Sequence, residues 1–255
     1  MNSPGFIDVA IALVLVAVAP GITRVWKIPI QKQMSIGVVR SFVQLTAVGF
    51  ALERIFDMQS LWLIALAIVV MLTIGARQAG MNVGNLPNRF WICLSSMTLG
   101  SLFTLGLMLA TGLITTEARY VIPLAGMLIS NSMNAATLTM KSICENLSDN
   151  RAAVESSLAL GKTWREASRK YQRRAITGGI VWIMNFMKTA GIVALPGAMT
   201  GMILAGADPL EAVLLQIIVG YMLLSAMTVT SVVSLEISIR LFFNEHHQFR
   251  LPEGI

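Results

Sequence analysis

The feature that most limits what this chain can fold into is a succession of apolar runs separated by more polar segments. A helix needs about 20 mostly apolar residues to cross the hydrocarbon core of a bilayer. Runs of roughly this kind occupy residues 6–22, 34–52, 61–76, 90–113, 121–140, 175–205 and 212–239. With 55% hydrophobic and 13% charged residues, the chain has too little polar surface to cover a water-soluble globule of its size. We therefore expect an all-α fold, a polytopic transmembrane bundle of about seven spans that forms one domain over residues 1–255.

The sixth run, residues 175–205, leaves the helix count open. Its roughly 31 residues exceed one crossing and fall short of two. It could be one kinked span, an interfacial helix followed by a span, or a re-entrant element. Because proline breaks a helix, a hinge is one interpretation of Pro196, Gly197 and Gly201. The spacing of the two glycines equally suits a static kink with tight helix packing.

The distribution of Lys and Arg predicts the orientation of the chain. If the N-terminus lies outside, fifteen of the 19 basic residues fall in inner segments, two in outer segments and two, Arg40 and Lys188, within spans. Since cytoplasmic loops carry the excess of Lys and Arg, we expect the N-terminus outside and the C-terminus inside. No basic residue precedes Arg24, so the first run lacks the positive start of a cleavable signal and is expected to remain as a helix. The net charge of +6 therefore reflects topology, and nucleic acid is not expected as a partner.

The longest polar connection, residues 141–174, is predicted to be a cytosolic amphipathic coupling segment. It contains no proline, and Gly161 is its only expected helix breaker. Lys162, Arg165 and Arg169 recur at helical spacing and form a basic stripe. Such a stripe is typical of a helix that lies on lipid headgroups, and it equally suits a surface that docks a cytosolic partner.

One short pattern within this segment favours docking. Glu155 is followed by two serines and, six positions later, by Gly161, the spacing of the loop by which many ABC permeases bind their ATPase. Small residues let such a loop lie close in a groove, and glycine permits a sharp turn between two short helices. A phosphate-binding loop is excluded, because Ser156 stands where that motif requires its first glycine. We therefore expect no cofactor in this chain, with ATP bound by a partner ATPase.

Three blocks of the sequence resemble one family, the FetB-type bacterial iron-export permeases with their plant aluminium-tolerance half-transporter relatives. The blocks are Val121 to Met127 with Asn131 and Met133; Leu158 to Gly161 with Thr163 and Ala167; and Lys188 to Gly191, Leu195 to Gly201, Ala205 to Pro209 and Gln216. The resemblance implies a dimeric permease in the bacterial cytoplasmic membrane, driven by a separately encoded ATPase and moving metal ions or metal-linked small molecules. The chain departs from the bacterial pattern at Ser130 and Ser132, where glycine and alanine are expected, and this leaves the substrate open.

Polar side chains within spans are the candidates for a substrate pathway, because they are costly in lipid and tend to face protein or water. Met127, Asn131 and Asn134 share one helix face, with Ser130 beside them. Amide oxygens suit hard cations and a thioether suits soft ones. The alternative is that Asn and Ser only hydrogen-bond between helices, as they do in many bundles.

Lys188 is the remaining candidate for the pathway. Within an apolar run it is expected to line an aqueous path, to bind an anionic chelate, or to pair with Asp208 or Glu236. If the sixth span begins near Gly191, Lys188 merely lies at the inner interface.

Three classes of function are compatible with a bundle of this kind. The leading hypothesis is a permease subunit of an ABC transporter that exports iron or another metal. The alternative is a self-sufficient ion-coupled transporter or channel that uses Arg40 and Lys188. An intramembrane enzyme is not expected, because the sequence has no nucleophile elbow, no His-Glu-x-x-His motif and no paired intramembrane carboxylates.

Overall fold

The computed structural model describes residues 16, 18, 20–27, 29–58, 60–193, 195–244 and 248–251. Most of the first predicted span, residues 6–22, therefore lies outside the described residues. The chain divides into two compact units, residues 1–59 and residues 60–255.

The described residues are almost entirely helical, and they include an isolated antiparallel bridge between Phe243 and Phe249. The helices are α2 (Gln31–Met58), α3 (Leu61–Asn82), α4 (Arg89–Ala110), α5 (Ala118–Asp149), α6 (Arg151–Ala159), α7 (Trp164–Thr189), α8 (Gly197–Leu204), α9 (Pro209–Ile239) and the 3₁₀ turn η1 (Arg240–Phe242). The predicted all-α class is confirmed.

Five of the described helices are long and apolar enough to cross a membrane: α2, α3, α4, α5 and α9. They correspond to the second, third, fourth, fifth and seventh predicted runs. The sixth run is not one continuous helix. Its first part is the C-terminal half of α7, its last part includes the short α8, and the described residues between them, 190–193, 195 and 196, are not helical. Pro196, which stands just before the first residue of α8, is the N-cap of that helix.

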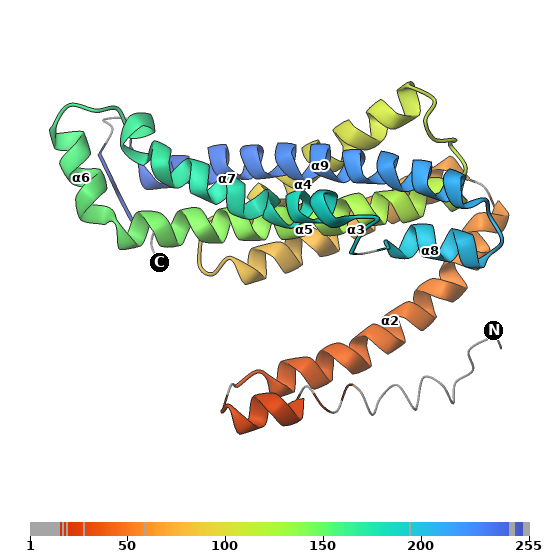
Figure 1. The fold of residues 1–255 in the computed structure, drawn as a ribbon. Coiled ribbons are helices and arrows are strands. Elements are labelled where there is room, and N and C mark those ends of the chain that lie inside the picture. Colours follow the sequence, from red (N-terminus) through yellow and green to blue (C-terminus); the bar gives the residue numbers. More distant parts are fainter. Residues whose placement is uncertain are drawn as a thin grey trace. The chain divides into compact units, whose positions relative to one another are not determined.

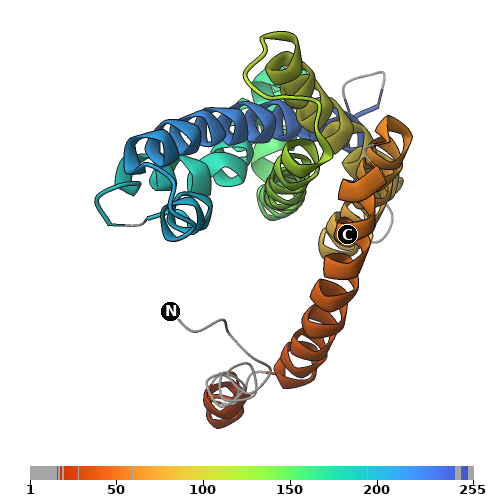
Figure 2. The ribbon, with the colours of Figure 1, turned by 90° about the vertical axis from the view of Figure 1, so that its right-hand side faces the viewer.

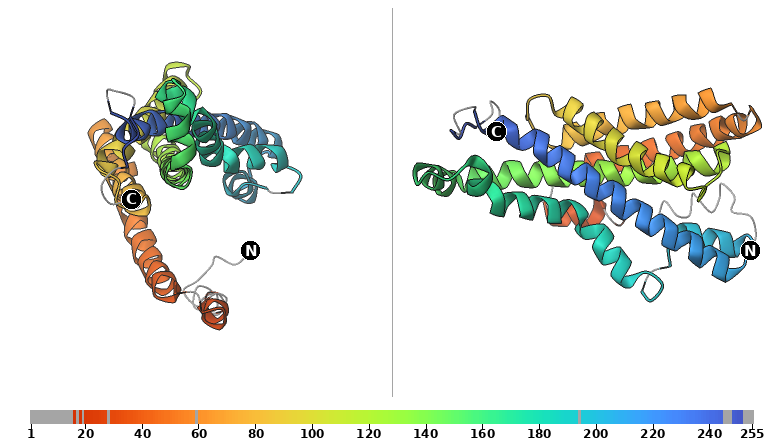
Figure 3. Two further views of the ribbon diagram at one scale, coloured as in Figure 1. Left: turned by 90° about the vertical axis from the view of Figure 1, so that its left-hand side faces the viewer. Right: turned by 90° about the horizontal axis from the view of Figure 1, so that it is seen from above.

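The unit formed by residues 60–255 is organised around α5. This helix packs against α3, α4, α7 and α9, and α9 in turn packs against α4, α5, α7 and α8. α9 runs obliquely across α5, which can be followed in Figure 1 and in the right-hand view of Figure 3. The end-on view of Figure 2 shows α7 and α8 on one side of α5 and α3 on the other.

The polarity of this unit is that of a membrane bundle. Large apolar side chains of α3 and α4, including Trp62, Val69 and Phe103, point outward. Hydroxyl groups lie inside: the buried polar residues of the described chain are Ser96, Ser101, Thr104, Ser132, Thr139, Ser168, Thr230, Ser231, Ser234 and Ser238. Small polar residues inside and large apolar residues outside are expected where lipid replaces water as the solvent.

Glycine allows three pairs of helices to come unusually close. A Cβ atom placed on Gly100 of α4 would lie 2.7 Å from the carbonyl oxygen of Ala226 in α9. A Cβ atom on Gly179 of α7 would lie 2.1 Å from Oγ1 of Thr139 in α5 and 2.6 Å from Oγ of Ser231 in α9. These two glycines therefore set the spacing of α4, α5, α7 and α9. Gly197 and Gly201, where the sequence suggested close packing, have no such neighbour within 4 Å.

Candidate functional site

The segment expected to dock a partner lies at one end of the bundle. α5 continues beyond the apolar run to Asp149, α6 follows, and a turn at residues 160–163 leads into α7 (Figure 1). We call residues 150–163, together with the exposed side chain of Arg169 in α7, the tip. Two details of the sequence interpretation were wrong. Gly161 is not the only break, because Asn150 separates α5 from α6, and the second helix flanking Gly161 is the 26-residue α7 and not a short one.

Gly161 closes α6 in a Schellman motif. Its own N–H donates to the carbonyl oxygen of Leu158 at 2.9 Å, and the N–H of Lys162 donates to that of Ser157 at 3.2 Å. The φ angle of Gly161 is +84°, a left-handed conformation that residues with a side chain adopt only under strain. The sharp turn expected at this glycine is present in the structure.

A capping box starts helix α7. The N–H and hydroxyl of Thr163 donate to Oε2 of Glu166, and the N–H of Glu166 donates to the Thr163 hydroxyl. The Thr163 donors hold the pKa of the Glu166 carboxyl below its ordinary value, with smaller contributions from nearby Lys162 and Arg169. The start of α7 is thus fixed directly after the turn at Gly161.

The surface of the tip is open. Leu160 is 81% exposed at the turn, and Glu155, Lys162 and Arg169 are also exposed. Glu155 forms an ion pair with Arg151, with 2.7 Å between Oε1 and Nε. An exposed leucine flanked by charged side chains is an arrangement suited to a partner surface.

The opposite face of α7 anchors the tip to the end of α9. Trp164 stacks on Phe243 with 5.6 Å between ring centroids. The guanidinium of Arg165 lies 5.1 Å from the centroid of the Trp164 ring and 3.7 Å from the carboxylate of Glu236. The sequence did not reveal this anchor, because it joins residues that are far apart in the chain. Arg165, predicted to contact a partner, is therefore also part of an intramolecular contact.

The predicted pathway residues lie on the face of α5 that the other helices of residues 60–255 leave uncovered. Ser130 and Asn134 are exposed and Met127 and Asn131 are half-buried, whereas Ser132 is buried and accepts a hydrogen bond from Ser101 at 3.2 Å. Ser130 and Asn131 both donate to the Met127 carbonyl oxygen of their own helix. The structure therefore gathers the four predicted residues on one face and shows no interhelical hydrogen bond from Ser130 or Asn131.

Lys188 lies in the last turn of α7 and is exposed. It is 24 residues after Trp164, which places it about 36 Å from the tip along the helix. The two expected partners are engaged elsewhere: Glu236 pairs with Arg165, and Asp208 caps α9 by accepting from the N–H groups of Leu210 and Glu211. In the described part of the chain Lys188 has no ion pair, and the C-terminal end of a helix is a favourable place for its charge.

The long apolar helices, the hydroxyl-lined interior and the apolar exterior together define a class: this is a multi-pass α-helical membrane protein. Within that class the chain belongs to UPF0014, an uncharacterised protein family whose model matches residues 6–243.

Several curated proteins are similar to the chain over most of its length. The UPF0014 membrane protein STAR2 of Oryza sativa subsp. japonica is 36% identical over 230 residues, which cover 90% of this chain and 81% of the relative. The protein ALUMINUM SENSITIVE 3 of Arabidopsis thaliana is 35% identical over 246 residues, which cover 96% of this chain and 90% of the relative. The probable iron export permease protein FetB of Escherichia coli is 31% identical over 250 residues, which cover 97% of this chain and 96% of the relative. The family resemblance inferred from the three sequence blocks is thereby confirmed. The search of solved structures gave no significant match.

Proposed function

We propose that this chain is the permease subunit of an ABC transporter and that a separate ATPase binds at the tip. The observation that carries the proposal is the tip itself, a short helix and a glycine turn with an exposed leucine and exposed basic side chains. A docking element of this kind is needed when the motor is another protein. ATP hydrolysis then belongs to that partner, and this chain is not an enzyme.

The connections of the tip suit it for transmitting force. It continues directly from α5 and leads directly into α7, and the contacts of Trp164 and Arg165 attach it to the end of α9. A movement imposed on the tip would therefore displace three helices of the bundle together. A tip joined to the membrane helices only by flexible chain would not transmit such a movement.

The arrangement of helix ends supports a topology with the tip in the cytosol. The connection between α3 and α4 lines a pocket together with the end of α5, and the end of α9 contacts the start of α7. These connections thus lie at one end of the bundle, together with most of its basic residues. The N-terminus outside, the C-terminus inside and α7 with α8 as the sixth of seven spans fit this arrangement and the positive-inside rule.

The uncovered face of α5 supports a homodimer. A face that carries Ser130 and Asn134 is poorly suited to lipid, because polar side chains are costly in the hydrocarbon region. A second copy of the chain placed on this face would enclose Met127, Asn131 and their neighbours between two subunits. We propose that this enclosed space is the substrate pathway and that Lys188 lies at its outer end.

We propose iron or another metal as the exported substrate, in the bacterial cytoplasmic membrane. The support is the similarity to FetB, whose name gives it as a probable iron export permease. Pro196, Gly197 and Gly201, at the start of α8, are proposed as the hinge that moves when the transporter changes state.

Co-purification with the ATPase tests the docking proposal. We expect a gene for a soluble ABC ATPase beside the gene for this chain, and the two proteins are purified together from a membrane extract. The double variant Lys162→Glu with Arg169→Glu is expected to weaken ATPase binding at least tenfold. Gly161→Pro is expected to do the same, because proline fixes φ near −65° where the turn requires +84°.

A matched variant separates docking from a general effect of charge. Arg24→Glu with Lys32→Glu makes the same change in net charge outside the tip and is expected to leave ATPase binding intact. If the tip variants insert in the membrane and still bind the ATPase with native affinity, the tip is not the docking site.

A further inference from the structure

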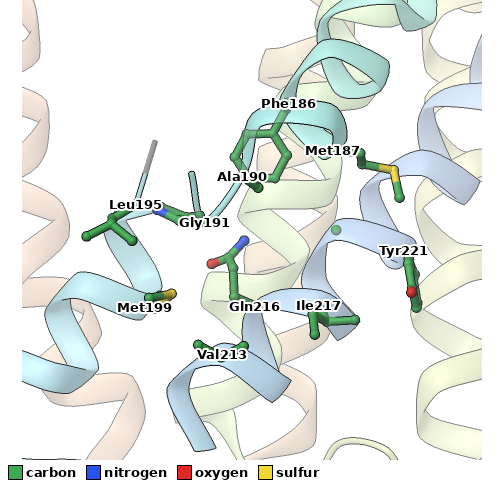
Figure 4. Close-up of a pocket in the computed structure, with 12 residues that line it drawn as sticks. Phe186, Met187, Ala190, Gly191, Leu195, Met199, Val213, Gln216, Ile217 and Tyr221 are labelled. Atoms are coloured by element: carbon green, nitrogen blue, oxygen red, sulfur yellow. The ribbon is translucent and has the colours of Figure 1, made fainter. Parts of the chain in front are cut away.

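A pocket lies where the sixth run is interrupted. Its volume is about 510 Å³, within the range of small-molecule sites. Its walls come from the end of α7, from Ala190, Gly191, Leu195 and Pro196, from the start of α8 and from the N-terminal half of α9 (Figure 4). Phe186, Met187, Met199 and Tyr221 contribute side chains to it. The lining is predominantly apolar, and neither the docking proposal nor the α5 face accounts for this pocket.

One polar side chain projects into the middle of this pocket. Figure 4 shows the amide of Gln216 between the start of α8 and the end of α7, surrounded by apolar side chains. Its Oε1 atom is buried and accepts no hydrogen bond from any described residue. A buried acceptor without a donor is unfavourable, so the site is built for a molecule that supplies one.

The chemistry of the lining selects against a bare metal ion. The pocket contains no Asp, Glu, His or Cys, and among the described residues no cluster of three such side chains could hold a metal. Two thioethers and one amide oxygen carry no charge to offset that of a cation stripped of its water. An apolar organic body against Phe186 and the methionines, with a hydroxyl or amine facing Gln216, satisfies both parts of the lining.

We propose that this pocket binds a predominantly apolar organic molecule that carries a hydroxyl or amine hydrogen-bond donor, and that Gln216 Oε1 accepts from that donor. The ligand comes either from the bilayer, as a lipid, or from the aqueous side, as a soluble compound. Because its walls lie on both sides of the break between α7 and α8, a bound molecule also fixes these two helices relative to each other.

A spectroscopic reporter stands next to the pocket. Trp182 stacks on the pocket residue Phe186 with 5.6 Å between ring centroids. In the full-length chain the other four tryptophans are changed to phenylalanine, and the protein is placed in phosphatidylcholine nanodiscs. Energy transfer from Trp182 is titrated with pyrenemethanol, which carries one hydroxyl, and with its methyl ether, which has no donor. We expect saturable binding of pyrenemethanol at least threefold tighter than that of the ether.

Two substitutions test the assignment of the donor and of the cavity. Gln216→Leu is expected to weaken pyrenemethanol binding about three- to tenfold and to leave ether binding unchanged, because it removes one hydrogen bond. Gly220 lines the pocket, and a Cβ there meets nothing within 4 Å, so Gly220→Leu is expected to fill the space and abolish saturable binding of both probes. The control Gly106→Leu, on α4 outside the lining, is expected to bind both probes normally.

The outcomes decide between the proposal and its failure. Equal affinity for the two probes, unchanged pyrenemethanol binding in Gln216→Leu, or saturable binding that persists in Gly220→Leu would overturn it. If nanodiscs containing phosphatidylglycerol or phosphatidylethanolamine, whose headgroups carry hydroxyls and an amine respectively, displace the probe, the natural ligand is a lipid. If neither lipid displaces it, the ligand is a soluble compound. The ATPase is absent from the experiment, so the result is independent of the docking proposal.

Discussion

Replacing Gly100 by alanine should force α4 and α9 apart. The added Cβ would lie 2.7 Å from the Ala226 carbonyl oxygen, 3.2 Å from the Thr230 nitrogen and 2.1 Å from Thr230 Oγ1. The Thr230 side chain has the freedom to rotate, but the first two atoms belong to the backbone of α9 and move only with the helix. Gly106 stands in the same helix with nothing within 4 Å of its Cβ position, which makes Gly106→Ala the matched control.

The two substitutions differ by the cost of overpacking. Alanine is favoured over glycine within a helix by roughly 0.5–1 kcal/mol, and both positions gain this term. An ordinary carbon–oxygen contact is about 3.3–3.6 Å, so a backbone carbonyl at 2.7 Å requires a shift of roughly 0.6 Å or more. Overpacking of a tight interior costs about 1–3 kcal/mol. Gly106→Ala should therefore raise the free energy of unfolding slightly. The free energy of unfolding of Gly100→Ala should be about 1–3 kcal/mol lower than that of Gly106→Ala.

Reversible unfolding in mixed micelles measures this difference directly. The free energy of unfolding is determined for the native chain and for both variants in the same detergent mixture. If Gly100→Ala and Gly106→Ala change that free energy by the same amount, within about 0.5 kcal/mol, α4 and α9 are not in the close contact described above.

Four further predictions concern the α5 face, the tip and the start of α7. Asn134→Cys should form a disulfide-linked dimer on mild oxidation, because a second copy is proposed to cover that face. Leu102→Cys, on the exposed side of α4, should not form such a dimer. Equal crosslinking at both positions would contradict the proposed dimer. Thr163→Ala should remove the cap of α7 and cost about 0.5–2 kcal/mol of local stability, seen as faster amide hydrogen exchange in its first turn. Because the folded pKa of Glu166 is lowered, its contribution is complete above the ordinary pKa of a glutamate and is lost as the pH falls through the lowered value. The protection factor of these amides, taken against the intrinsic exchange rate at each pH, should therefore fall at acid pH in the native chain but not in Glu166→Gln. Trp164→Ala should free the end of α9, so that protease cleaves near Phe243 sooner while α5 keeps its protection.

The positions of most helices could be predicted from the sequence because a bilayer imposes one simple rule. A span must be apolar over about 20 residues, and the runs that became α3, α4, α5 and α9 obey this rule. The number of helices in the run at residues 175–205 could not be predicted, because its apolar content continues through the non-helical break between α7 and α8. The break at Asn150 carries no proline or glycine, so no local signal marked it.

The residues that hold helices together were harder to find. The close approaches at Gly100 and Gly179 depend on what lies opposite each glycine in another helix, which helical periodicity does not report. The stack of Trp164 on Phe243 likewise joins distant parts of the chain. A weak signal did exist for the anchor, because Trp164, Ser168 and Tyr171 share one face of α7, and Ser168 and Tyr171 are indeed buried.

The predicted functional residues fall into two groups. Met127, Ser130, Asn131 and Asn134 were gathered correctly on one face, because an uninterrupted helix fixes the relation of its own residues. The partners of Lys188 could not be predicted, since pairing depends on where α7 and α9 end relative to each other.

The most direct test of the account is transport by the purified chain in liposomes. The protein is reconstituted with and without the ABC ATPase, and ATP-dependent movement of radioactive iron is followed across the membrane. The account predicts transport only when ATP and the ATPase are both present on the side of the tip, with loss of transport in Lys162→Glu with Arg169→Glu. Iron transport at the full rate by this chain alone, driven by an ion gradient, would contradict it and would identify a self-sufficient transporter.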